Sequence, residues 1–559
     1  MDRPVPRTGP QAASGKRTEH PTGHNSLIAP CNRRARKCIF LSRQCNSGMR
    51  PRGDLLAATR AGGETMNRPL RHIAVFCGAL VLALLVRATW VQFVQADRLA
   101  NDDNNRRVKI EAYSYPLGNI IVNGKPITGS TQTSGDFKYK RTYTDGAMYA
   151  PVTGYARQAA GETMLEGVYR KVLNGKDDRL FFNRARGMLT GEKPRGGDVL
   201  TTISEKAQKA AYKGLTDLHA NGAVVALDPR SGKILAMAST PSYDPSTFAG
   251  LSDAEGKKYL ALEADKGKPM NNRALREIYP PGSTFKVLTA AAALEHGTVG
   301  DINASSGAPA PYTLPQTRTQ VGNDVAGAPC DKASLKTGMQ WSCNNVFLDA
   351  AHKLGTDKMR ETAEKFGFNA EQFIPVRSAV SGYPSKLDQP QTALTGMGQG
   401  SVTSTPLQMA MVAAGIANNG KVMKPYLVEE LRGPDLSTIE KFDPAPLNPK
   451  EPQAVSQDTA QKVQEMMEYT VSDGTASKAK IDGVTVGGKT GTAQHGANVN
   501  DERPYAWFVS YAKLPDGSSP VAVAVFVDPK DMDIPRSEIA GGKLGGPIAK
   551  SVMQAVLNQ

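Results

Sequence analysis

Residues 221–245 read NGAVVALDPRSGKILAMASTPSYDP and provide the clearest fold signal in the second half of the chain. Two apolar runs, Ala223 to Leu227 and Lys233 to Ala238, flank the link Asp-Pro-Arg-Ser-Gly at 228–232. Apolar runs joined by turn-forming residues predict an antiparallel β-hairpin.

The region around and after this hairpin carries further strand and helix signals. Strand signals lie at both of its ends and helical signals lie between them, so the two ends are expected to share one sheet. We therefore expect an α+β domain over residues 216–559, with a central antiparallel sheet flanked by helices. The expected strands are 484–486, 506–511 and 521–527, and the expected helices are 283–294, 406–417 and 548–557.

Composition and charge narrow the class of protein. The chain has 559 residues, of which 40% are hydrophobic and 22% charged, as in a globular protein with a core. The formal charge is +15, but residues 1–65 hold twelve Lys or Arg against four Asp or Glu, and residues 66–96 add three Arg. The rest of the chain is nearly balanced, so the charge does not indicate a nucleic-acid partner.

The first 65 residues are rich in Pro, Gly, Arg and Ser and lack apolar periodicity. Such a segment cannot pack a core, so we expect a disordered basic leader. Met66 is followed by a short basic segment and then an apolar stretch, which is typical of a true amino terminus. We therefore expect that translation starts at Met66 and that residues 1–65 are not translated.

An apolar stretch from Ile73 to Val94 contains a single charge, Arg87. Its 22 residues would form a helix of about 33 Å, long enough to cross a bilayer. We expect residues 66–96 to form a cytoplasmic stub and an uncleaved membrane anchor; a cleaved signal peptide and a buried core helix remain alternatives. Arg68 and Arg71 precede the stretch, which predicts a single-pass plasma-membrane protein with the bulk of the chain, including residues 216–559, outside the cytoplasm.

Between the anchor and the hairpin, residues 97–215 carry short β-prone runs and turn signals at Asn123-Gly124 and Gly196-Gly197. This pattern predicts a small mixed pedestal domain.

Three short patterns point to chemistry: Ser283-Thr-Phe-Lys286, Ser342-Cys-Asn344 and Lys489-Thr-Gly-Thr492. Each is weak alone. Ser-x-x-Lys recurs at 477–480 and 510–513, and Lys-Thr-Gly recurs at 336–338, so the surrounding sequence must choose among them.

Ser283 follows Pro280-Pro281-Gly282 and precedes an Ala-rich apolar run, so it should begin a buried helix. Free N–H groups at a helix start favour an oxyanion there, and the Lys286 amine, one turn further on, is expected beside the Ser283 hydroxyl. Burial would lower the lysine pKa and let the amine act as a base. A capping serine with a lysine that extends to solvent is the alternative.

Lys489 follows the β-branched run 484–486 and is expected on an edge strand. Gly487, Gly488 and Gly491 remove side chains there, so a substrate backbone could lie against the strand. Ser342 and Asn344 could instead be loop residues that satisfy local backbone groups. By contrast, Ser510 and Lys513 should point to opposite faces of a strand, which rules out that pair.

In this order, the three motifs resemble the signature of the penicilloyl serine transferases. Asn221 to Pro245, Tyr279 to Leu294 and Gly396 to Gly420 also look like parts of penicillin-binding transpeptidases, a resemblance that covers roughly 60% of the chain. With one membrane span and a pedestal, the chain is similar to class B penicillin-binding proteins, and most to the A type of actinobacteria.

The resemblance implies a peptidoglycan D,D-transpeptidase that cross-links stem peptides and is acylated by β-lactams. Ser283 would be the nucleophile and Lys286 its base, while Ser342 would relay a proton and Asn344 would hold the substrate amide. Lys489 would face the substrate carboxylate. The hydroxyls of Thr490 and Thr492 would also bind this carboxylate, and Gly491 lies between them in the same substrate-binding strand. The backbone N–H groups of Ser283 and Thr492 would form the oxyanion hole.

The resemblance also implies partners among the membrane proteins of cell-wall synthesis or division, and neither cofactor nor metal. The alternatives are a D,D-carboxypeptidase or β-lactamase, and a non-catalytic β-lactam sensor or scaffold. The segment Tyr115 to Ile120 departs from the pattern of many class B members, which leaves the pedestal partners open.

Cys330 and Cys343 lie thirteen residues apart in an expected oxidising compartment, which predicts a disulfide that stiffens the turn of Ser342 and Asn344. Cys31, Cys38 and Cys45 recur every seven residues but have no fourth ligand for zinc.

Two further features could have a role in function: a match to a phosphate-binding loop and His495. Residues 483–490, GVTVGGKT, match a phosphate-binding loop, but no helical pattern follows them, so nucleotide binding is not expected. His495 is expected to be a loop residue, with a contact at the rim of the site as the alternative.

Overall fold

The computed structural model describes residues 67–558 except 101, 103–104, 160, 192–194 and 497–501. The basic leader, its three cysteines and the expected start at Met66 lie outside the described residues. The chain divides into two compact units, Met1–Val94 and Gln95–Gln559.

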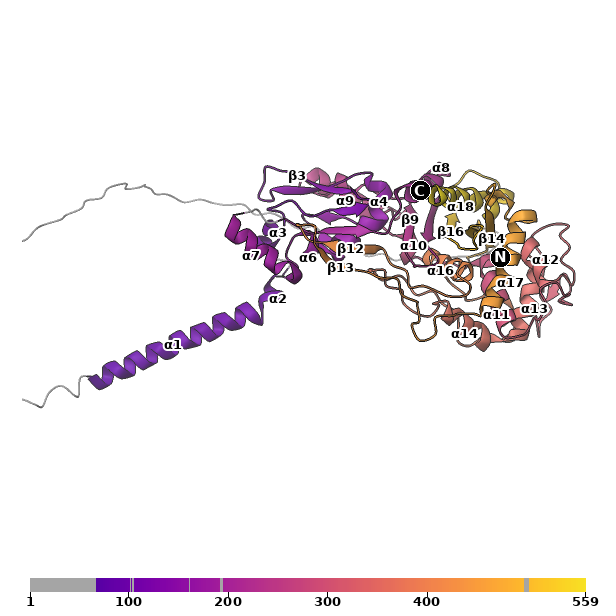
Figure 1. Ribbon diagram of the computed structural model, residues 1–559, viewed down its shortest axis with the longest axis horizontal. Helices are drawn as coiled ribbons and strands as arrows, with labels where there is room; N and C mark the ends of the chain where they lie inside the picture. Colours follow the sequence, from indigo (N-terminus) through magenta and orange to yellow (C-terminus); the bar gives the residue numbers. More distant parts are fainter. Residues whose placement is uncertain are drawn as a thin grey trace, which may run out of the picture. The chain divides into compact units, whose positions relative to one another are not determined.

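The described part of the first unit is α1 (Asn67–Phe93) (Figure 1). Its residues Arg68–Phe93 have a mean hydropathy of 2.1 and are long and apolar enough to cross a membrane. The predicted apolar helix is therefore present, and it begins six residues before Ile73 because Asn67 to His72 continue the helical backbone.

The second unit contains a mixed region whose five-stranded sheet has the order β13-β12-β7-β1-β2. β1 and β7 are parallel, and β12 pairs antiparallel with β7. Because β12 and β13 come from residues 428–441, the chain returns from its second half to complete the pedestal sheet, which the sequence did not predict. The elements here are α2 (Ala96–Ala100), α3 (Arg106–Ala112), β1 (Ile120–Val122), β2 (Lys125–Pro126), β3 (Thr128–Gln132), β4 (Tyr139–Tyr143), α4 (Gly146–Thr153), β5 (Ala156–Arg157), β6 (Gly161–Glu162), α5 (Met164–Val168), α6 (Arg170–Leu173), α7 (Phe181–Thr190), β7 (Asp198–Thr201), β12 (Val428–Arg432) and β13 (Thr438–Lys441).

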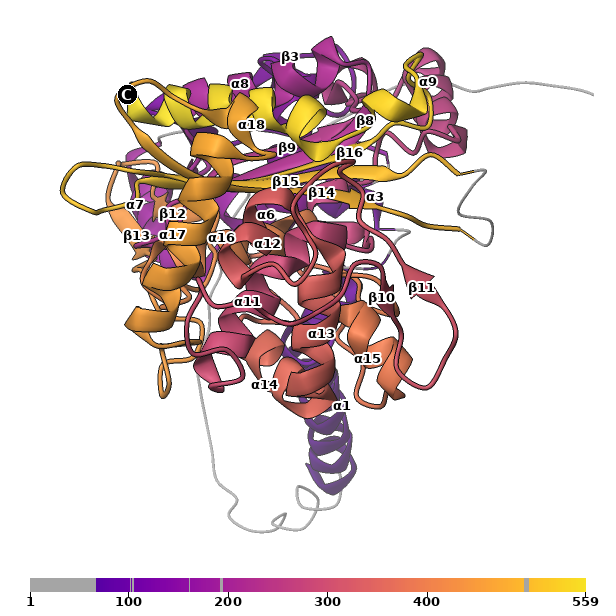
Figure 2. The same ribbon diagram turned by 90° about the vertical axis from the view of Figure 1, so that its right-hand side faces the viewer.

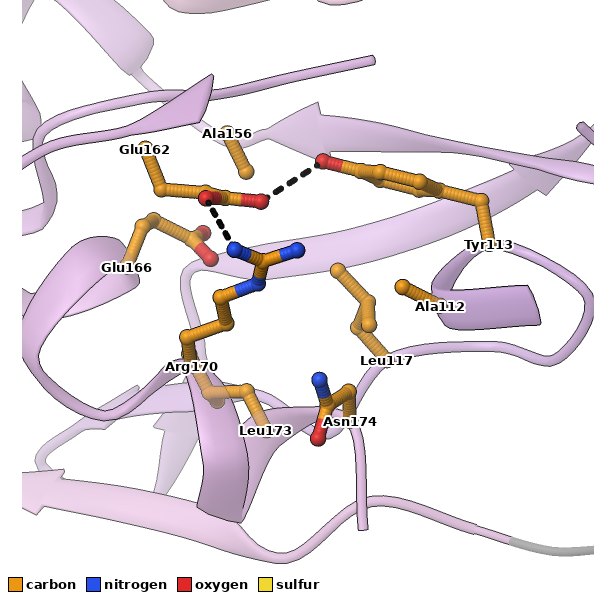
Figure 3. A pocket seen from close by; sticks show the side chains of 9 residues that line it. All are labelled: Ala112, Tyr113, Leu117, Ala156, Glu162, Glu166, Arg170, Leu173 and Asn174. Atoms are coloured by element: carbon orange, nitrogen blue, oxygen red, sulfur yellow. Dashed lines mark hydrogen bonds and ion pairs between the residues drawn. The ribbon is translucent and has the colours of Figure 1, made fainter. Parts of the chain in front are cut away.

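A charged cluster lies inside the pedestal. Arg141 on β4 is buried and donates through Nε to Glu166 of α5 at 2.6 Å and through Nη1 to the Gly118 carbonyl at 2.7 Å. Glu166 also lines a small pocket, in which Tyr113 donates to Glu162 at 3.2 Å and Arg170 lies 3.6 Å from the same carboxylate (Figure 3). Burial raises the pKa of Glu166, although the Arg141 charge opposes this.

The larger region is built on a five-stranded sheet of order β14-β15-β16-β8-β9, in which all neighbours are antiparallel. The two ends of the region share this sheet, as predicted. The turn of the first hairpin is closed by Asp228, whose carboxylate accepts from Arg230 N at 3.0 Å and Ser231 Oγ at 2.7 Å. The strands are β8 (Asn221–Leu227), β9 (Ile234–Thr240), β14 (Thr485–Ala493), β15 (Tyr505–Lys513) and β16 (Val521–Asp528).

Helices cover both faces of this sheet. Alternate side chains of β15 separate the two faces: Phe508 packs with α8 (Glu205–Asp217) and α18 (Gly541–Leu557), and Trp507 packs into the opposite core. Figure 2 shows α8 and α18 over one face and α11 (Lys286–Glu295), α16 (Pro406–Ala417) and α17 (Gln457–Asp473) over the other. The predicted α+β class with a central antiparallel sheet is confirmed.

The helix predicted at 406–417 is present with the same bounds as α16, and the helices predicted at 283–294 and 548–557 are present with shifted ends. The helix predicted at 548–557 begins at Gly541, because its glycine-rich first turns lie against the sheet: a Cβ on Gly541 would come within 1.8 Å of the Trp507 carbonyl oxygen. The remaining elements are α9 (Asp253–Ala264), α10 (Arg273–Arg276), α12 (Leu335–Trp341), α13 (Asn344–Leu354), α14 (Thr356–Lys365), α15 (Gln389–Thr395), β10 (Tyr312–Thr313) and β11 (Gln320–Val321).

Candidate active site

The three motifs meet on one side of the sheet of order β14-β15-β16-β8-β9. Ser283 lies in a 3₁₀ turn (Gly282–Phe285) that leads into α11, where Lys286 is the first residue. Ser342 ends α12 and Asn344 begins α13, while Lys489 lies on the edge strand β14. All five are buried. The fold therefore brings together residues up to 206 positions apart in the sequence.

The Lys286 amine is held by the second motif. Its Nζ donates to the Ser342 carbonyl and to Asn344 Oδ1, both at 2.7 Å, and lies 3.2 Å from Ser342 Oγ. The Phe347 ring centroid lies 5.5 Å away. Burial lowers the pKa of Lys286 to about 7, although the charge of Asp324 opposes the shift, so this amine can exchange a proton near neutral pH.

A second lysine reaches the same hydroxyl. Lys489 Nζ donates to Ser342 Oγ at 2.8 Å and to the Thr490 carbonyl at 2.9 Å. Burial, followed by the like charge of Lys286, holds the pKa of Lys489 well below its usual value. Two buried amines that contact one hydroxyl repel each other when both are protonated, which favours the neutral form of one of them. Ser342 Oγ therefore lies where a proton can pass to or from the Lys286 and Lys489 amines.

Ser283 occupies a fixed turn. Gly282 has φ +53° and its N–H donates to the Gly398 carbonyl at 3.0 Å, while Trp507 Nε1 donates to Pro280 O at 3.0 Å. Sequence reasoning expected the Lys286 amine beside the Ser283 hydroxyl, but among the described residues no hydrogen bond joins them. The reason is that Lys286 gives its protons to Ser342 and Asn344 instead.

The strand β14 presents the third motif. Thr490 Oγ1 lies 3.1 Å from Thr475 Oγ1, and Thr492 pairs with Ala506 across the sheet. A Cβ on Gly491 would lie 2.9 Å from Thr284 Cγ2, so the missing side chain allows β14 to pack against the turn that carries Ser283.

The interpretation of the two earlier glycines as space for substrate was wrong. A Cβ on Gly487 would lie 2.3 Å from Tyr511 Cζ, and one on Gly488 would lie 2.9 Å from Val471 Cγ2. The chain's own side chains fill this space.

Cys330 and Cys343 form a disulfide with an S–S distance of 2.03 Å. It ties the residue between Ser342 and Asn344 to the segment before α12. That segment also brings Asn323 to the site, where its Oδ1 accepts from Asn344 N at 2.6 Å. Sequence reasoning missed Asn323, Asp324 and Phe347; the cysteine spacing was the available signal that this segment approaches the second motif.

The recurring motifs lie elsewhere. Lys336 on α12 pairs with Glu465 at 2.7 Å, away from the three motifs. Ser510 contacts Met553 of α18 and Lys513 contacts Glu468 of α17, so they lie on opposite faces as predicted.

The structure also shows where the stretch that matches a phosphate-binding loop and His495 lie. β14 continues through Lys489 and Thr490 to Ala493, so these two residues lie inside a strand and not at the start of a helix. His495 lies beyond that strand, stacks on Tyr505 with centroids 3.8 Å apart and contacts the Arg503 carbonyl at 2.8 Å.

This fold and site define a class of protein, and comparisons with known families agree. Residues 222–554 match the penicillin binding protein transpeptidase domain, and residues 117–199 match the penicillin binding protein A dimerisation domain. The chain belongs to the penicillin-binding transpeptidases and is a serine-type enzyme of that family.

Several curated relatives are named as peptidoglycan D,D-transpeptidases. The chain is 39% identical over 502 residues to the peptidoglycan D,D-transpeptidase PbpA of Mycolicibacterium smegmatis, with 88% of this chain and 100% of that protein covered. It is 38% identical over 500 residues to PbpA of Mycobacterium tuberculosis, covering 88% and 99%. Among solved structures, the ceftriaxone acyl-enzyme of penicillin-binding protein A from M. tuberculosis matches with a TM-score of 0.75 and 37% identity, covering 80% of this chain and 100% of that one.

Proposed function

We propose that this chain cross-links peptidoglycan stem peptides by D,D-transpeptidation through an acyl-enzyme on Ser283. The observation that carries the proposal is the convergence of Lys286 and Lys489 on Ser342, in a buried site beside the turn of Ser283. The relatives named as D,D-transpeptidases and as β-lactam acyl-enzymes support it.

In the first step, Ser283 Oγ attacks the penultimate D-Ala carbonyl while its proton passes to neutral Lys286. A neutral amine has two N–H groups, which match the two acceptors at 2.7 Å, and its lone pair is then left for a hydroxyl proton. The Oγ–C bond forms, the C–N bond to terminal D-Ala breaks, and the leaving nitrogen takes the proton through Ser342.

Other groups bind the peptide and stabilise the negative oxygen. Lys489, with the Thr490 and Thr492 hydroxyls, would face the terminal carboxylate, and Asn344 would hold the substrate amide. The N–H groups of Ser283 and Thr492 would donate to the oxyanion.

In the second step, an amine of another stem peptide attacks the ester. A C–N bond forms, the C–O bond to Ser283 breaks, and the proton that the attacking amine loses returns to Ser283 Oγ through Lys286. A β-lactam would acylate Ser283 in the same way and block this step. No cofactor enters either step.

We also propose the location and partners of the enzyme. Helix α1 would anchor the chain in the plasma membrane with Arg68 and Arg71 on the cytoplasmic side, so that the catalytic region works outside the cytoplasm. The region over 97–215 would serve as a pedestal for membrane proteins of cell-wall synthesis or division, while residues 216–559 form the transpeptidase region.

Intact-protein mass spectrometry with penicillin G tests the proposal. The wild type should gain one penicilloyl group, Ser283→Ala none, and the matched control Ser477→Ala one group, because Ser477 begins a recurring Ser-x-x-Lys outside the site. A short-lived adduct would instead indicate a β-lactamase, and no adduct on the wild type would indicate a non-catalytic sensor or scaffold. Cross-linking of stem peptides by the same three proteins then separates transpeptidation from hydrolysis.

A further inference from the structure

The segment 322–324, between β11 and α12, lies against the first residue of α13. Asn344 Nδ2 donates to the Gly322 carbonyl at 2.8 Å and lies 3.5 Å from Asp324 Oδ2. Asn344 Oδ1 faces the other way and accepts from Lys286 at 2.7 Å. Both ends of one amide therefore have fixed partners, the second lone pair of Oδ1 stays available for the substrate amide, and the segment decides which end faces the lysine.

The segment itself is anchored. Asn323 Oδ1 accepts from the N–H groups of Asn344 at 2.6 Å and Asn345 at 3.4 Å, which caps the start of α13. Asn345 Nδ2 donates to the Cys330 carbonyl at 2.7 Å, and Cys330 is bonded to Cys343. This double attachment keeps the Asp324 carboxylate next to the catalytic amide.

Asp324 is also the negative charge that bears on both buried lysines. Among the described residues, the charged groups acting on the Lys286 amine are Lys489 from β14 and Asp324 from this segment. α12 and α13 present only uncharged groups to that amine, namely Ser342, Asn344 and the Phe347 ring. Without Asp324 the site would hold two like charges and no opposite one.

We infer that Asp324 is a positioning residue of the transpeptidase site: its carboxylate fixes the orientation of the Asn344 amide and supplies the opposite charge for the Lys286–Lys489 pair. The inference deepens the proposed function and rests on it. Asp324 acts through Asn344 and the lysines and takes no part in bond formation. Because the residue is exposed, substituting it should leave folding intact.

The role predicts a specific change in pH dependence. The negative charge of Asp324 favours the protonated amines and so raises the pKa of Lys286. Removing the charge lets Lys286 lose its proton at lower pH, so the acidic limb of the acylation profile moves to lower pH. A substitution that only disturbed the fold would lower the rate at every pH and leave the midpoint in place.

The experiment measures the second-order rate constant of acylation by penicillin G from pH 5 to 9 on the detergent-solubilised full chain. Asp324→Asn keeps an acceptor oxygen and removes the charge, so its midpoint should fall by about half a pH unit. Asp324→Ala also loses the contact to Asn344, so its plateau should fall about two- to tenfold as well. Asp324→Glu should restore the wild-type midpoint.

Asp331→Asn is the matched control. Asp331 is exposed like Asp324, lies in the same connection between β11 and α12 but on the other side of Cys330, and accepts a hydrogen bond from Ala310 N at 3.0 Å. Its profile should superimpose on that of the wild type. An unmoved midpoint in Asp324→Asn, or an equal shift in Asp331→Asn, overturns the inference. A wild type that forms no adduct overturns the proposed function instead, so the two failures are distinguishable.

Discussion

The pedestal and the catalytic region bury charge in opposite ways. In the pedestal, Arg141 and Glu166 are opposite charges 2.6 Å apart, both fully buried. In the catalytic region, Lys286 and Lys489 are like charges on one hydroxyl, and both are fully buried too. One pair attracts, while the other repels; among the described residues, neutral acceptors hold the two amines and Asp324 lies nearby.

The difference separates a structural device from a chemical one. A buried opposite pair attracts across the gap between its elements and fixes them in place, here β4 and α5. Burial lowers the pKa of both lysines, and the like charge of Lys286 adds to the shift of Lys489; this costs stability but yields a base that works near neutral pH. The following predictions test this contrast, beginning with the largest expected effect.

Removing one lysine should affect chemistry far more than stability. Lys286→Met should lower the acylation rate by about 10²- to 10⁴-fold, because the base is lost. Its free energy of unfolding should change by only about 1 kcal/mol, since losing a buried charge offsets the lost hydrogen bonds. Stopped-flow acylation and urea titration measure the two quantities. Lys336→Met is the control, and a rate for Lys286→Met within tenfold of wild type would contradict the assigned role.

Removing one partner of the pedestal pair should have the reverse effect. Arg141→Met should lower the free energy of unfolding by about 3–5 kcal/mol, because Glu166 would stay buried without its partner. The folded fraction should still acylate at the wild-type rate. Urea titration measures the loss, and the double variant Arg141→Met with Glu166→Leu should recover most of it. A single variant as stable as the wild type would refute the structural role of the pair.

The disulfide should contribute less to the free energy of unfolding than the Arg141–Glu166 pair does, and it lies in the catalytic region. Replacing Cys330 and Cys343 by alanine should lower the free energy of unfolding by about 3 kcal/mol, because the bond closes a short loop in the unfolded chain. The acylation rate should also fall, since the segment of Asn323 would be less firmly held. Peptide mapping under non-reducing conditions checks the bond itself; separate Cys330 and Cys343 peptides would end this prediction.

The two clusters should also give opposite slopes of stability against pH. Burial lowers the pKa of Lys286 to about 7 in the folded chain, from the ordinary value of 10.5 that applies to the unfolded chain. Between these values the unfolded state holds more protons, so its contribution to stability rises with pH, by at most about 1.4 kcal/mol per pH unit. Glu166 has a raised pKa in the folded chain, so its contribution falls as the pH rises above about 4.5.

Urea titrations at pH 7 and pH 8 measure the first slope. From pH 7 to pH 8, the free energy of unfolding of the wild type should rise by about 1 kcal/mol more than that of Lys286→Met. The Glu166→Gln variant isolates the second slope at lower pH. Equal slopes in wild type and Lys286→Met would show that Lys286 keeps an ordinary pKa in the folded chain.

Much of the fold followed from local patterns in the sequence. The hairpin at 221–240, the later strands and the helix 406–417 were predictable, because apolar alternation and periodicity report burial within a few residues. The motif order likewise selected Ser283, Ser342 and Lys489 over their recurrences, since strand and helix context differ locally. The predicted start of helix α18 was seven residues too late, because its glycine-rich first turns resemble a loop when the strand packed against them is not known.

Tertiary structure alone decided which distant segments meet. That β12 completes the pedestal sheet, that Gly487 receives the Tyr511 ring, and that Asn323 and Asp324 hold Asn344 depends on contacts between residues far apart in the chain. The sequence determined the reactive groups and the elements that carry them. Only the packed fold placed two amines on one hydroxyl and a carboxylate beside them, because burial and charge depend on all neighbours in space and not on those along the chain.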